Sequence, residues 1–214
     1  MYAKFIKRGL DFLLSLIALI VLSPVLLILI VVGAIAMKGT PFFVQRRPGK
    51  IKRKTGQERI FPLLKFRTMT NERDANGQLL PDDVRLNRYG RFLRSTSLDE
   101  LPSLLNILVG HISIVGPRPL LVAYLPRYNA TQRRRHEVRP GLTGYAQAYG
   151  RNSLSWEDKF EKDIYYVDHV SFGLDFKILI QTVVVVLKKE GISSDTSATM
   201  EEFTGTPLQE EANV

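Results

Sequence analysis

Two adjacent carboxylates, Asp99 and Glu100, are the residues of this chain that are best suited to catalysis. Ser97 stands three residues before Glu100, and Ser-x-x-Glu fits a capping box at the start of a helix. As structural residues, the acids would only cap that helix and complement its dipole. As functional residues, they would use the free N–H groups of the helix start, which bind phosphate and hold an aspartate ionised. Asp99 could then be both a nucleophile and a metal ligand.

A second candidate is Arg118, which stands between Pro117 and Pro119. The prolines restrict the backbone, so the guanidinium loses little further freedom when it binds, as two-pronged phosphate binding requires. The alternative is an ordinary rigid turn with a solvated arginine. Arg139-Pro140-Gly141-Leu142-Thr143-Gly144 and Gly150-Arg151 repeat the pattern of arginine beside proline or glycine. Glycine allows the backbone to approach a ligand closely.

Lys65 and Thr68 belong to a third candidate, the extended segment 63–69. This segment could line a phosphate or nucleotide site, or it could be a solvated strand face. Taken together, the three places combine carboxylates with several cations. Such a set suits a diphosphate bound with a divalent metal, because Mg²⁺ takes one or two carboxylates plus substrate phosphates.

The element that would position these residues begins with an uncharged stretch from Phe12 to Met37, interrupted by Ser23-Pro24. Both ends of the stretch are basic, and basic flanks favour the cytoplasmic side of a membrane, so one straight crossing cannot satisfy both. Proline lacks an N–H and bends a helix, and Ser23 can cap the freed backbone groups. The pattern therefore predicts a re-entrant helix pair that enters and leaves by the cytoplasmic face.

Two alternatives to the re-entrant pair remain. A cleaved signal peptide would use Ala34-x-Ala36 as its cleavage site, but its apolar core is usually about 7–15 residues, much shorter than this one. A plain spanning anchor with a tolerated proline would place the basic residues before Phe12 on the opposite side.

Composition narrows the function further. The chain has 214 residues, no cysteine and a net charge of +9. Disulfides, thiolate metal sites and cysteine nucleophiles are thus excluded. From Ser193 onward there are five acidic and no basic residues, so the tail carries −5 and the preceding part +14. The clusters 46–54 and 133–135 are expected to contact anionic lipid headgroups. Nucleic acid, the competing polyanion, is not predicted, because no zinc-finger or aromatic RNA-binding signature accompanies the charge.

The remaining patterns predict a helix-rich α+β fold. Segments 42–45 and 63–69 are predicted to be strands, and helices are predicted after Pro102, from Trp156 to Asp168 and from Leu174 to Lys189. The last helix is too short to span a bilayer and is predicted to be core or interfacial. We expect a re-entrant membrane element at 1–39, a small cytosolic catalytic domain with amphipathic interfacial helices at 40–192, and an acidic tail at 193–214.

In the order and spacing of its motifs, the chain resembles a known family, the small monotopic phosphoglycosyl transferases of bacteria, which are part of the bacterial sugar transferases. The minimal enzymes typified by the bacillosamine phosphate transferase of protein N-glycosylation are the most similar subgroup. The similarity extends from about Tyr2 to Gly205. It rests on ordered motifs, which are Ser23-Pro24, Val44-Gln45-Arg46-Arg47-Pro48-Gly49, Lys65-Phe66-Arg67-Thr68-Met69, Arg94 to Pro102, Val115-Gly116-Pro117-Arg118-Pro119, Arg139 to Gly144 and Gly150-Arg151-Asn152.

The resemblance implies a reaction, in which a sugar 1-phosphate passes from a UDP-sugar to a polyprenol phosphate, usually undecaprenyl phosphate, with release of UMP and use of Mg²⁺. It implies that Asp99 is the nucleophile and a metal ligand and that Glu100 is its partner. Arg94, Arg118, Arg151, Lys65 and Thr68 match family positions near the phosphates, and Asp163 lies in the matching C-terminal stretch.

The implied location is the cytoplasmic face of the bacterial inner membrane, as a monotopic protein. A homodimer is left open. The resemblance departs from the family at His111 and at Ala148-Tyr149, near the expected substrate region, which leaves the sugar undetermined. A membrane-associated basic scaffold without catalysis is the alternative function, and it predicts no release of UMP.

Overall fold

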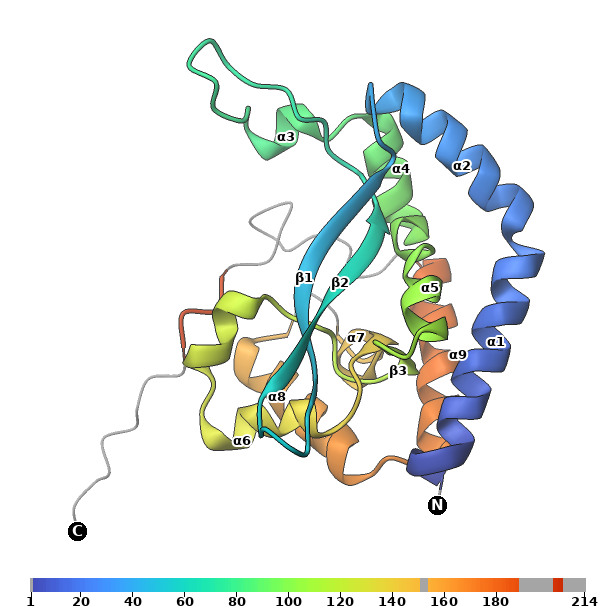
Figure 1. Ribbon diagram of the computed structural model, residues 1–214, viewed down its shortest axis with the longest axis vertical. Coiled ribbons are helices and arrows are strands. Elements are labelled where there is room, and N and C mark those ends of the chain that lie inside the picture. Colours follow the sequence, from blue (N-terminus) through green and yellow to red (C-terminus); the bar gives the residue numbers. More distant parts are fainter. Residues whose placement is uncertain (1, 151–153, 189–201, 206–214) are drawn as a thin grey trace, which may run out of the picture.

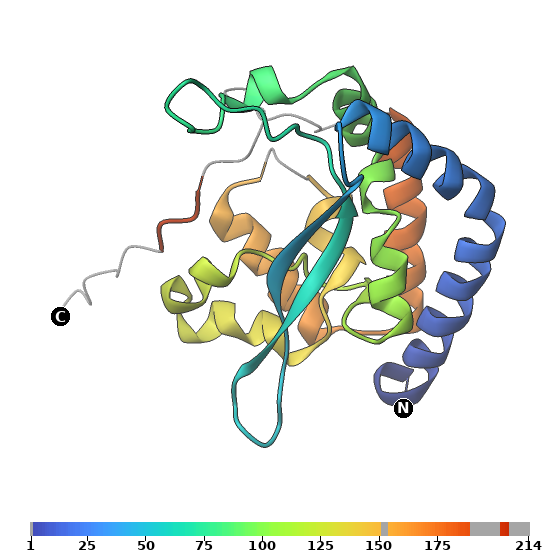
Figure 2. The same cartoon turned by 45° about the horizontal axis from the view of Figure 1, so that its top comes forward.

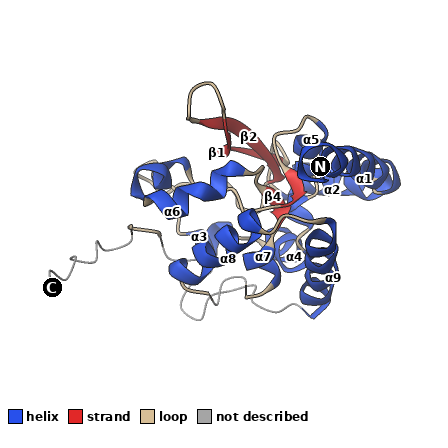
Figure 3. Ribbon diagram, turned by 90° about the horizontal axis from the view of Figure 1, so that it is seen from below, coloured by secondary structure: helices blue, strands red, loops and turns tan. Residues whose placement is uncertain are grey.

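The structure is a computed structural model that describes residues 2–150, 154–188 and 202–205. Within these ranges, helices dominate and the strands form two small sheets of two strands each (Figure 3). The elements in chain order are η1 (Tyr2–Ile6, a π-helix), α1 (Lys7–Val21), α2 (Ser23–Ala36), β1 (Phe42–Ile51), β2 (Glu58–Phe66), α3 (Asp82–Arg85), α4 (Arg88–Thr96), η2 (Leu98–Glu100, a 3₁₀-helix), α5 (Ser103–Leu108), β3 (Ser113–Val115), η3 (Val122–Arg127, 3₁₀), α6 (Ala130–Arg133), η4 (Arg134–Glu137, 3₁₀), β4 (Gly141–Thr143), α7 (Tyr145–Ala148), α8 (Trp156–Asp168) and α9 (Phe172–Lys188). The predicted helix-rich α+β class is confirmed.

The helices α1 and α2 form a bent pair along one side of the molecule (Figure 1). In the described part of the chain no single helix is long and apolar enough to cross a membrane, but this pair meets the test together, with a bend of 65°. The bend follows from local chemistry. Pro24 cannot donate to the carbonyl of Ile20, and the hydroxyl of Ser23 donates to that oxygen instead, at 2.7 Å. The predicted break at Ser23-Pro24 is confirmed.

The inward face of α1 is polar and tied to the rest of the fold. The buried carboxylate of Asp11 accepts hydrogen bonds from the hydroxyl of Ser113 at 2.7 Å and from the amide of Ile114 at 3.0 Å. Arg8 donates to the carbonyls of Ile107 and Leu108, each at 2.6 Å, at the end of α5. These bonds explain why α1 packs along α5 (Figures 1 and 2).

The outward face of the pair is apolar and exposed. Val21, Leu27 and Ile35 show 68%, 64% and 74% of their surface to solvent. A contiguous exposed apolar surface of this kind marks a membrane or protein contact. The pair therefore has the two faces that a re-entrant membrane element needs, one for lipid and one for the domain.

The long ribbon formed by β1 and β2 differs from the predicted strands at 42–45 and 63–69. The strands pair antiparallel from Phe42 opposite Phe66 to Ile51 opposite Glu58, so β1 extends beyond residue 45 and β2 ends before residue 69. Pro48 and Pro62 lie within the paired region. Proline is tolerated in edge strands, because an N–H missing from the outer side removes no ladder bond, and both strands of a two-stranded ribbon are edge strands.

Two of the four clusters of buried side chains in the described residues hold the centre of the fold together. One lies between the ribbon and α5 and contains Phe61, Leu63, Leu104, Ile107 and Ile112. The other joins β3, α7, α8 and α9. The predicted helices at 156–168 and 174–189 correspond to α8 and α9; α9 begins two residues earlier, at Phe172, and residue 189 lies outside the described residues. On α9, Phe172, Phe176, Ile180 and Val183 are exposed, as expected of an interfacial helix.

The predicted headgroup contact of the arginines at 133–135 is wrong for Arg135. Arg135 is buried against Asp163, with 2.6 Å between Nη2 and the carboxylate. Arg133 pairs with Glu58 at 2.7 Å, and Arg134 pairs with Asp168. All three arginines form ion pairs within the protein, because carboxylates distant in the sequence lie next to them in the fold.

Candidate active site

Asp99 and Glu100 lie in η2, a single 3₁₀ turn, and not at the start of a longer helix. Ser97 ends α4 in the left-handed conformation, with φ of 57°, and its side chain makes no capping hydrogen bond to η2. The capping-box prediction is therefore wrong. A three-residue turn also has little dipole, so burial and neighbouring side chains determine the charge state of the two acids.

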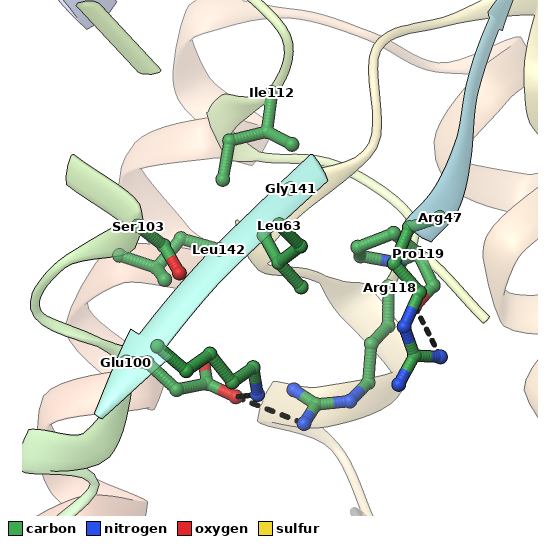
Figure 4. A pocket seen from close by; sticks show the side chains of 10 residues that line it. Arg47, Leu63, Glu100, Ser103, Ile112, Arg118, Pro119, Gly141 and Leu142 are labelled. Carbon is green, nitrogen blue, oxygen red and sulfur yellow. Dashed lines mark hydrogen bonds and ion pairs between the residues drawn. The ribbon is translucent and has the colours of Figure 1, made fainter. Parts of the chain in front are cut away.

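Glu100 is held by two cations from distant segments (Figure 4). One carboxylate oxygen, Oε1, accepts from Nζ of Lys65 at 2.6 Å and from Nη2 of Arg118 at 2.9 Å. Burial alone would raise the pKa of Glu100, but the charges of Arg118 and Lys65 outweigh it and lower this pKa to about 2. Glu100 is therefore ionised at any working pH and fixes the two cations beside it.

Asp99 has a different environment. It is half-buried and makes no hydrogen bond or ion pair with any other residue that the structure describes. Burial and the negative charge of Glu100 raise the pKa of Asp99, while Lys65, Arg118 and Arg94 partly oppose that rise. Adjacent carboxylates with pKa values pushed apart are typical of sites where the two groups have different roles. Of the two acids, Glu100 is occupied by ion pairs, whereas the side chain of Asp99 has no ion-pair partner among the described residues.

Thr68 and Arg94 contact each other, while their predicted roles at the phosphates stay predictions. Nε of Arg94 donates to the hydroxyl of Thr68 at 3.1 Å. The contact depends on Gly90 in α4, because a Cβ there would lie 1.8 Å from the carbonyl oxygen of Thr68. Glycine thus lets α4 lie directly on the chain that follows β2. Arg94 is also close enough to Asp99 to lower its pKa.

The glycines of segments 115–119 and 139–144 lie close against each other's backbone. A Cβ on Gly116 would lie 2.4 Å from the carbonyl oxygen of Arg139, and one on Gly144 would lie 2.2 Å from the carbonyl oxygen of Gly116. The amides of Gly116 and Gly141 donate to the carbonyls of Thr143 and Pro117, each at 2.9 Å. Gly141 also lines the pocket that contains Arg118, so a close approach of its backbone to a ligand stays a prediction. The glycine contacts lock the two segments together, which fixes the backbone that carries Arg118.

Arg47 is a site residue that the sequence reasoning missed, because the basic run 46–54 was assigned to lipid headgroups. It lines a pocket with Lys65, Glu100 and Arg118 (Figure 4). Its Nη1 donates to the carbonyl of Pro119 at 3.2 Å. Burial and the charge of Arg118 lower the pKa of Arg47 to about 10. Two adjacent guanidiniums repel, so an anion between them would be favourable.

Three further predictions concern residues outside this group. Arg151 lies outside the described residues, so its placement stays a prediction. Asp163 is buried with Arg135 and has a structural partner. Ser23 and Pro24 lie at the bend between α1 and α2.

The charge balance of the site suits a diphosphate. Four cations, which are Arg47, Lys65, Arg94 and Arg118, face two carboxylates, so two positive charges are in excess. The described residues contain no group of three or more His, Cys, Asp or Glu that could hold a metal ion by themselves. Mg²⁺ does not need such a group, because it takes one or two carboxylates and completes its shell with phosphate oxygens and water. The free carboxylate of Asp99 fits that requirement.

Comparison with known proteins identifies a family whose named members act on diphosphate-linked sugars. A family model described as bacterial sugar transferase matches residues 2–189. An uncharacterized sugar transferase, EpsL of Bacillus subtilis, is 51% identical over 200 residues, which cover 94% of this chain and 96% of that protein. A UDP-N-acetylgalactosamine-undecaprenyl-phosphate N-acetylgalactosaminephosphotransferase of Aeromonas hydrophila is 35% identical over 86% of this chain. A UDP-glucose:undecaprenyl-phosphate glucose-1-phosphate transferase of Klebsiella pneumoniae is 38% identical over 83% of it.

The relatives differ in length. The matched part is 44% of the Aeromonas protein and 39% of the Klebsiella protein. The chain therefore spans about two-fifths of these larger relatives but nearly all of the Bacillus protein.

Proposed function

Because this chain belongs to the bacterial sugar transferase family, we propose that it transfers a sugar 1-phosphate from a UDP-sugar to undecaprenyl phosphate and releases UMP. The chain is thus an enzyme of the phosphotransferase type. The observation that carries the proposal is the group around η2, where a free carboxylate lies beside an ionised one and several cations.

In the first step, a carboxylate oxygen of Asp99 attacks the β-phosphorus of the UDP-sugar. A bond forms between Asp99 and that phosphorus, and the bond from the phosphorus to the bridging oxygen breaks. UMP leaves with the bridging oxygen. Lys65, Arg47 and Arg118 would stabilise the charge that develops on the phosphate oxygens, which is the main demand of phosphoryl transfer.

In the second step, a phosphate oxygen of undecaprenyl phosphate attacks the same phosphorus and displaces Asp99, which gives undecaprenyl diphosphate sugar. Glu100 helps to position the acceptor phosphate or to remove its proton. A covalent intermediate lets the water-soluble donor and the lipid acceptor react in turn, so one small site need not hold both.

Mg²⁺ is proposed as the cofactor, with Asp99 as its protein ligand. When bound, it would neutralise negative charge on the diphosphate. Lys65 and Arg118 keep Glu100 occupied, which leaves Asp99 as the available carboxylate.

The enzyme is proposed to act at the cytoplasmic face of the bacterial inner membrane. The bent pair α1–α2, with its exposed apolar side, supports a monotopic re-entrant arrangement. Residues 1–39 would be the membrane element, 40–192 the catalytic domain, and 193–214 an acidic tail. The basic surface would face anionic lipids. Whether the enzyme forms a homodimer is an open question, and nucleic acid is not a proposed partner.

An N-acetylated sugar is the proposed donor group, from the resemblance to the bacillosamine phosphate transferases. The named relatives support this only in part, because one carries N-acetylgalactosamine in its name and another carries glucose. A glycoconjugate such as a polysaccharide or a glycosylated protein would be the product of the pathway that this reaction opens.

The test uses purified enzyme in lipid nanodiscs with undecaprenyl phosphate, Mg²⁺ and a panel of UDP-sugars. Wild-type enzyme should release UMP with at least one of them. Without acceptor, UMP release should stop at one equivalent per enzyme, and the peptide containing Asp99 should gain the mass of one sugar phosphate.

The matched control is Asp99→Asn, which keeps the shape of the side chain but removes the nucleophile. This variant should fold, bind the nucleotide and release no UMP. Catalytic UMP release by Asp99→Asn, or an adduct on Glu100, would overturn the role of Asp99. No UMP release by the wild type with any donor would favour the scaffold alternative.

A further inference from the structure

A short C-terminal segment, Glu202 to Gly205, packs back onto the body of the protein. It lies beyond residue 189, where the match to the family model ends. In Figure 1 this segment is red and lies beside the yellow-green chain that contains η3. Phe203 is 1% exposed, whereas its neighbours Glu202 and Thr204 are exposed. One side chain of the segment is therefore inserted into the fold.

The insertion site is a cluster of aromatic rings. The centroid of the Phe203 ring lies 5.0 Å from that of Phe160, 5.3 Å from Trp156, 5.7 Å from Tyr124 and 5.8 Å from Tyr128. These are the separations at which aromatic pairs are attractive. Phe203 thus completes a cluster built from η3, the chain after it and the first turns of α8.

Arg127 fixes the segment from the side. Its Nη1 donates to the carboxylate of Glu202 at 2.8 Å and also to the carbonyl oxygen of Phe203. Its guanidinium lies 5.5 Å from the centroid of the Tyr124 ring. The backbone and the side chain of the segment are therefore both held.

The aromatic cluster connects to the candidate active site through Arg135. The guanidinium of this buried arginine lies 5.8 Å from the Tyr128 ring and 5.7 Å from the Phe160 ring. It pairs with Asp163, and its Nη2 donates at 2.7 Å to the carbonyl oxygen of Arg118. Arg135 therefore joins the rings that contact Phe203 to the backbone of the arginine that contacts Glu100.

We propose that Phe203 is a positioning residue for Arg118. Its ring holds Tyr128 and Phe160 against Arg135, and Arg135 in turn holds the backbone of Arg118 so that the guanidinium points at the bound diphosphate. This role rests on the proposed function, because it assumes that Arg118 binds the donor phosphates. The C-terminal segment would then complete the donor site, although it contributes no atom to the pocket.

The test is a double-mutant cycle that joins Phe203 to Arg118. Phe203→Ala is measured in the wild-type and the Arg118→Ala backgrounds, at a temperature well below unfolding. The readouts are the Kd of UDP and the KM and kcat for UMP release. In the wild-type background Phe203→Ala should weaken UDP binding by about fivefold or more, whereas in the Arg118→Ala background it should change UDP binding less than about twofold.

Two further variants separate positioning from stability. Phe203→Leu keeps most of the buried volume and should recover most of the affinity for UDP. Thr204→Ala changes the exposed neighbour and should leave Kd, KM and kcat as in the wild type.

Equal losses of UDP affinity in both backgrounds would overturn the positioning role, because the effect would not pass through Arg118. Unchanged UDP affinity in Phe203→Ala would overturn it as well, even if the unfolding temperature falls. If those results come with normal UMP release by the wild type, the proposed function stands without this role. A wild-type enzyme that releases no UMP would overturn the proposed function and this role together.

Discussion

Replacing Arg118 by alanine should damage catalysis far more than stability. In the free site the Arg118 side chain is 46% exposed and pairs with Glu100 at 2.9 Å. Water reaches the pair from the arginine side and screens it, so its contribution stays near the roughly 0–1 kcal/mol that is typical of exposed ion pairs. Glu100 also keeps Lys65 at 2.6 Å, so the variant does not leave a buried carboxylate without a partner. The loss of unfolding free energy should be at most about 1 kcal/mol, or roughly 2–4 °C for a protein of this size.

The effect on turnover has a different origin. With substrate bound, Arg118 would donate charge-assisted hydrogen bonds to the diphosphate, and the loss of such a bond costs about 1.5–3 kcal/mol. Since about 1.4 kcal/mol is a factor of ten, kcat/KM of Arg118→Ala should fall by about 10–150-fold. Arg118→Lys should recover only part of this loss, because an ammonium cannot reproduce the two-pronged guanidinium contact.

The assay is UMP release over a range of UDP-sugar concentrations, with the unfolding midpoint measured in the same detergent or nanodisc preparation. Arg91→Ala is a suitable control, since Arg91 is an exposed arginine on α4. A kcat/KM within threefold of the wild type in Arg118→Ala would refute the reasoning. So would a large fall in the unfolding midpoint, because Arg118 would then be a structural residue.

Three other sets of variants test separate parts of the structure. Ala3→Cys and Lys50→Cys, made singly in this cysteine-free chain, should both be protected from a membrane-impermeant thiol reagent in intact cells and labelled after lysis; labelling of the Ala3→Cys variant alone in intact cells would rule out a re-entrant pair. Gly116→Ala should lower the unfolding midpoint, because its Cβ would lie 2.4 Å from the carbonyl oxygen of Arg139 and overpacking costs about 1–3 kcal/mol, while Gly173→Ala, with open space around it, should not; equal midpoints for the two would contradict the loop contact. Glu100→Gln removes a negative charge that raises the pKa of Asp99, so Asp99 should stay ionised to lower pH, and the acid side of the pH profile for single-turnover UMP release should move to lower pH; an unmoved or upward-shifted profile would show that Asp99 does not set it.

Some of this architecture could be predicted from the sequence because single residues determine it. Pro24 removes one hydrogen bond from a helix, and Ser23 is the neighbour able to replace it, so the bend was predictable from the chain alone. The length of the ribbon was not. Pro48 and Pro62 argue against strands in a periodicity analysis, and only the two-stranded pairing makes them acceptable.

The candidate site likewise has a part that the sequence predicts and a part that only the structure shows. Lys65, Thr68, Arg94, Arg118 and the two acids could be predicted, because their residue types and order along the chain are distinctive. Their electrostatics could not, since the pKa of Glu100 depends on partners 35 and 18 residues away. Arg47 was missed because it stands in a basic run. The sequence feature that could have identified it is Pro48-Gly49, which follows Arg47 just as Pro140-Gly141 follows Arg139.

The polar contacts beneath α1 make the N-terminal helices and the catalytic domain one mechanical unit. Arg8 and Asp11 join α1 to the end of α5 and to β3, and Tyr89 donates to the carbonyl of Leu29 in α2 at 2.8 Å. With the helix pair in a bilayer, the depth at which its apolar face comes to rest would set the height of Asp99 above the lipid headgroups. Because a re-entrant pair rests in one leaflet, any change in that depth would move the whole site relative to the phosphate of a lipid acceptor in the same leaflet, and the packing of that leaflet would act on turnover through the position of Asp99.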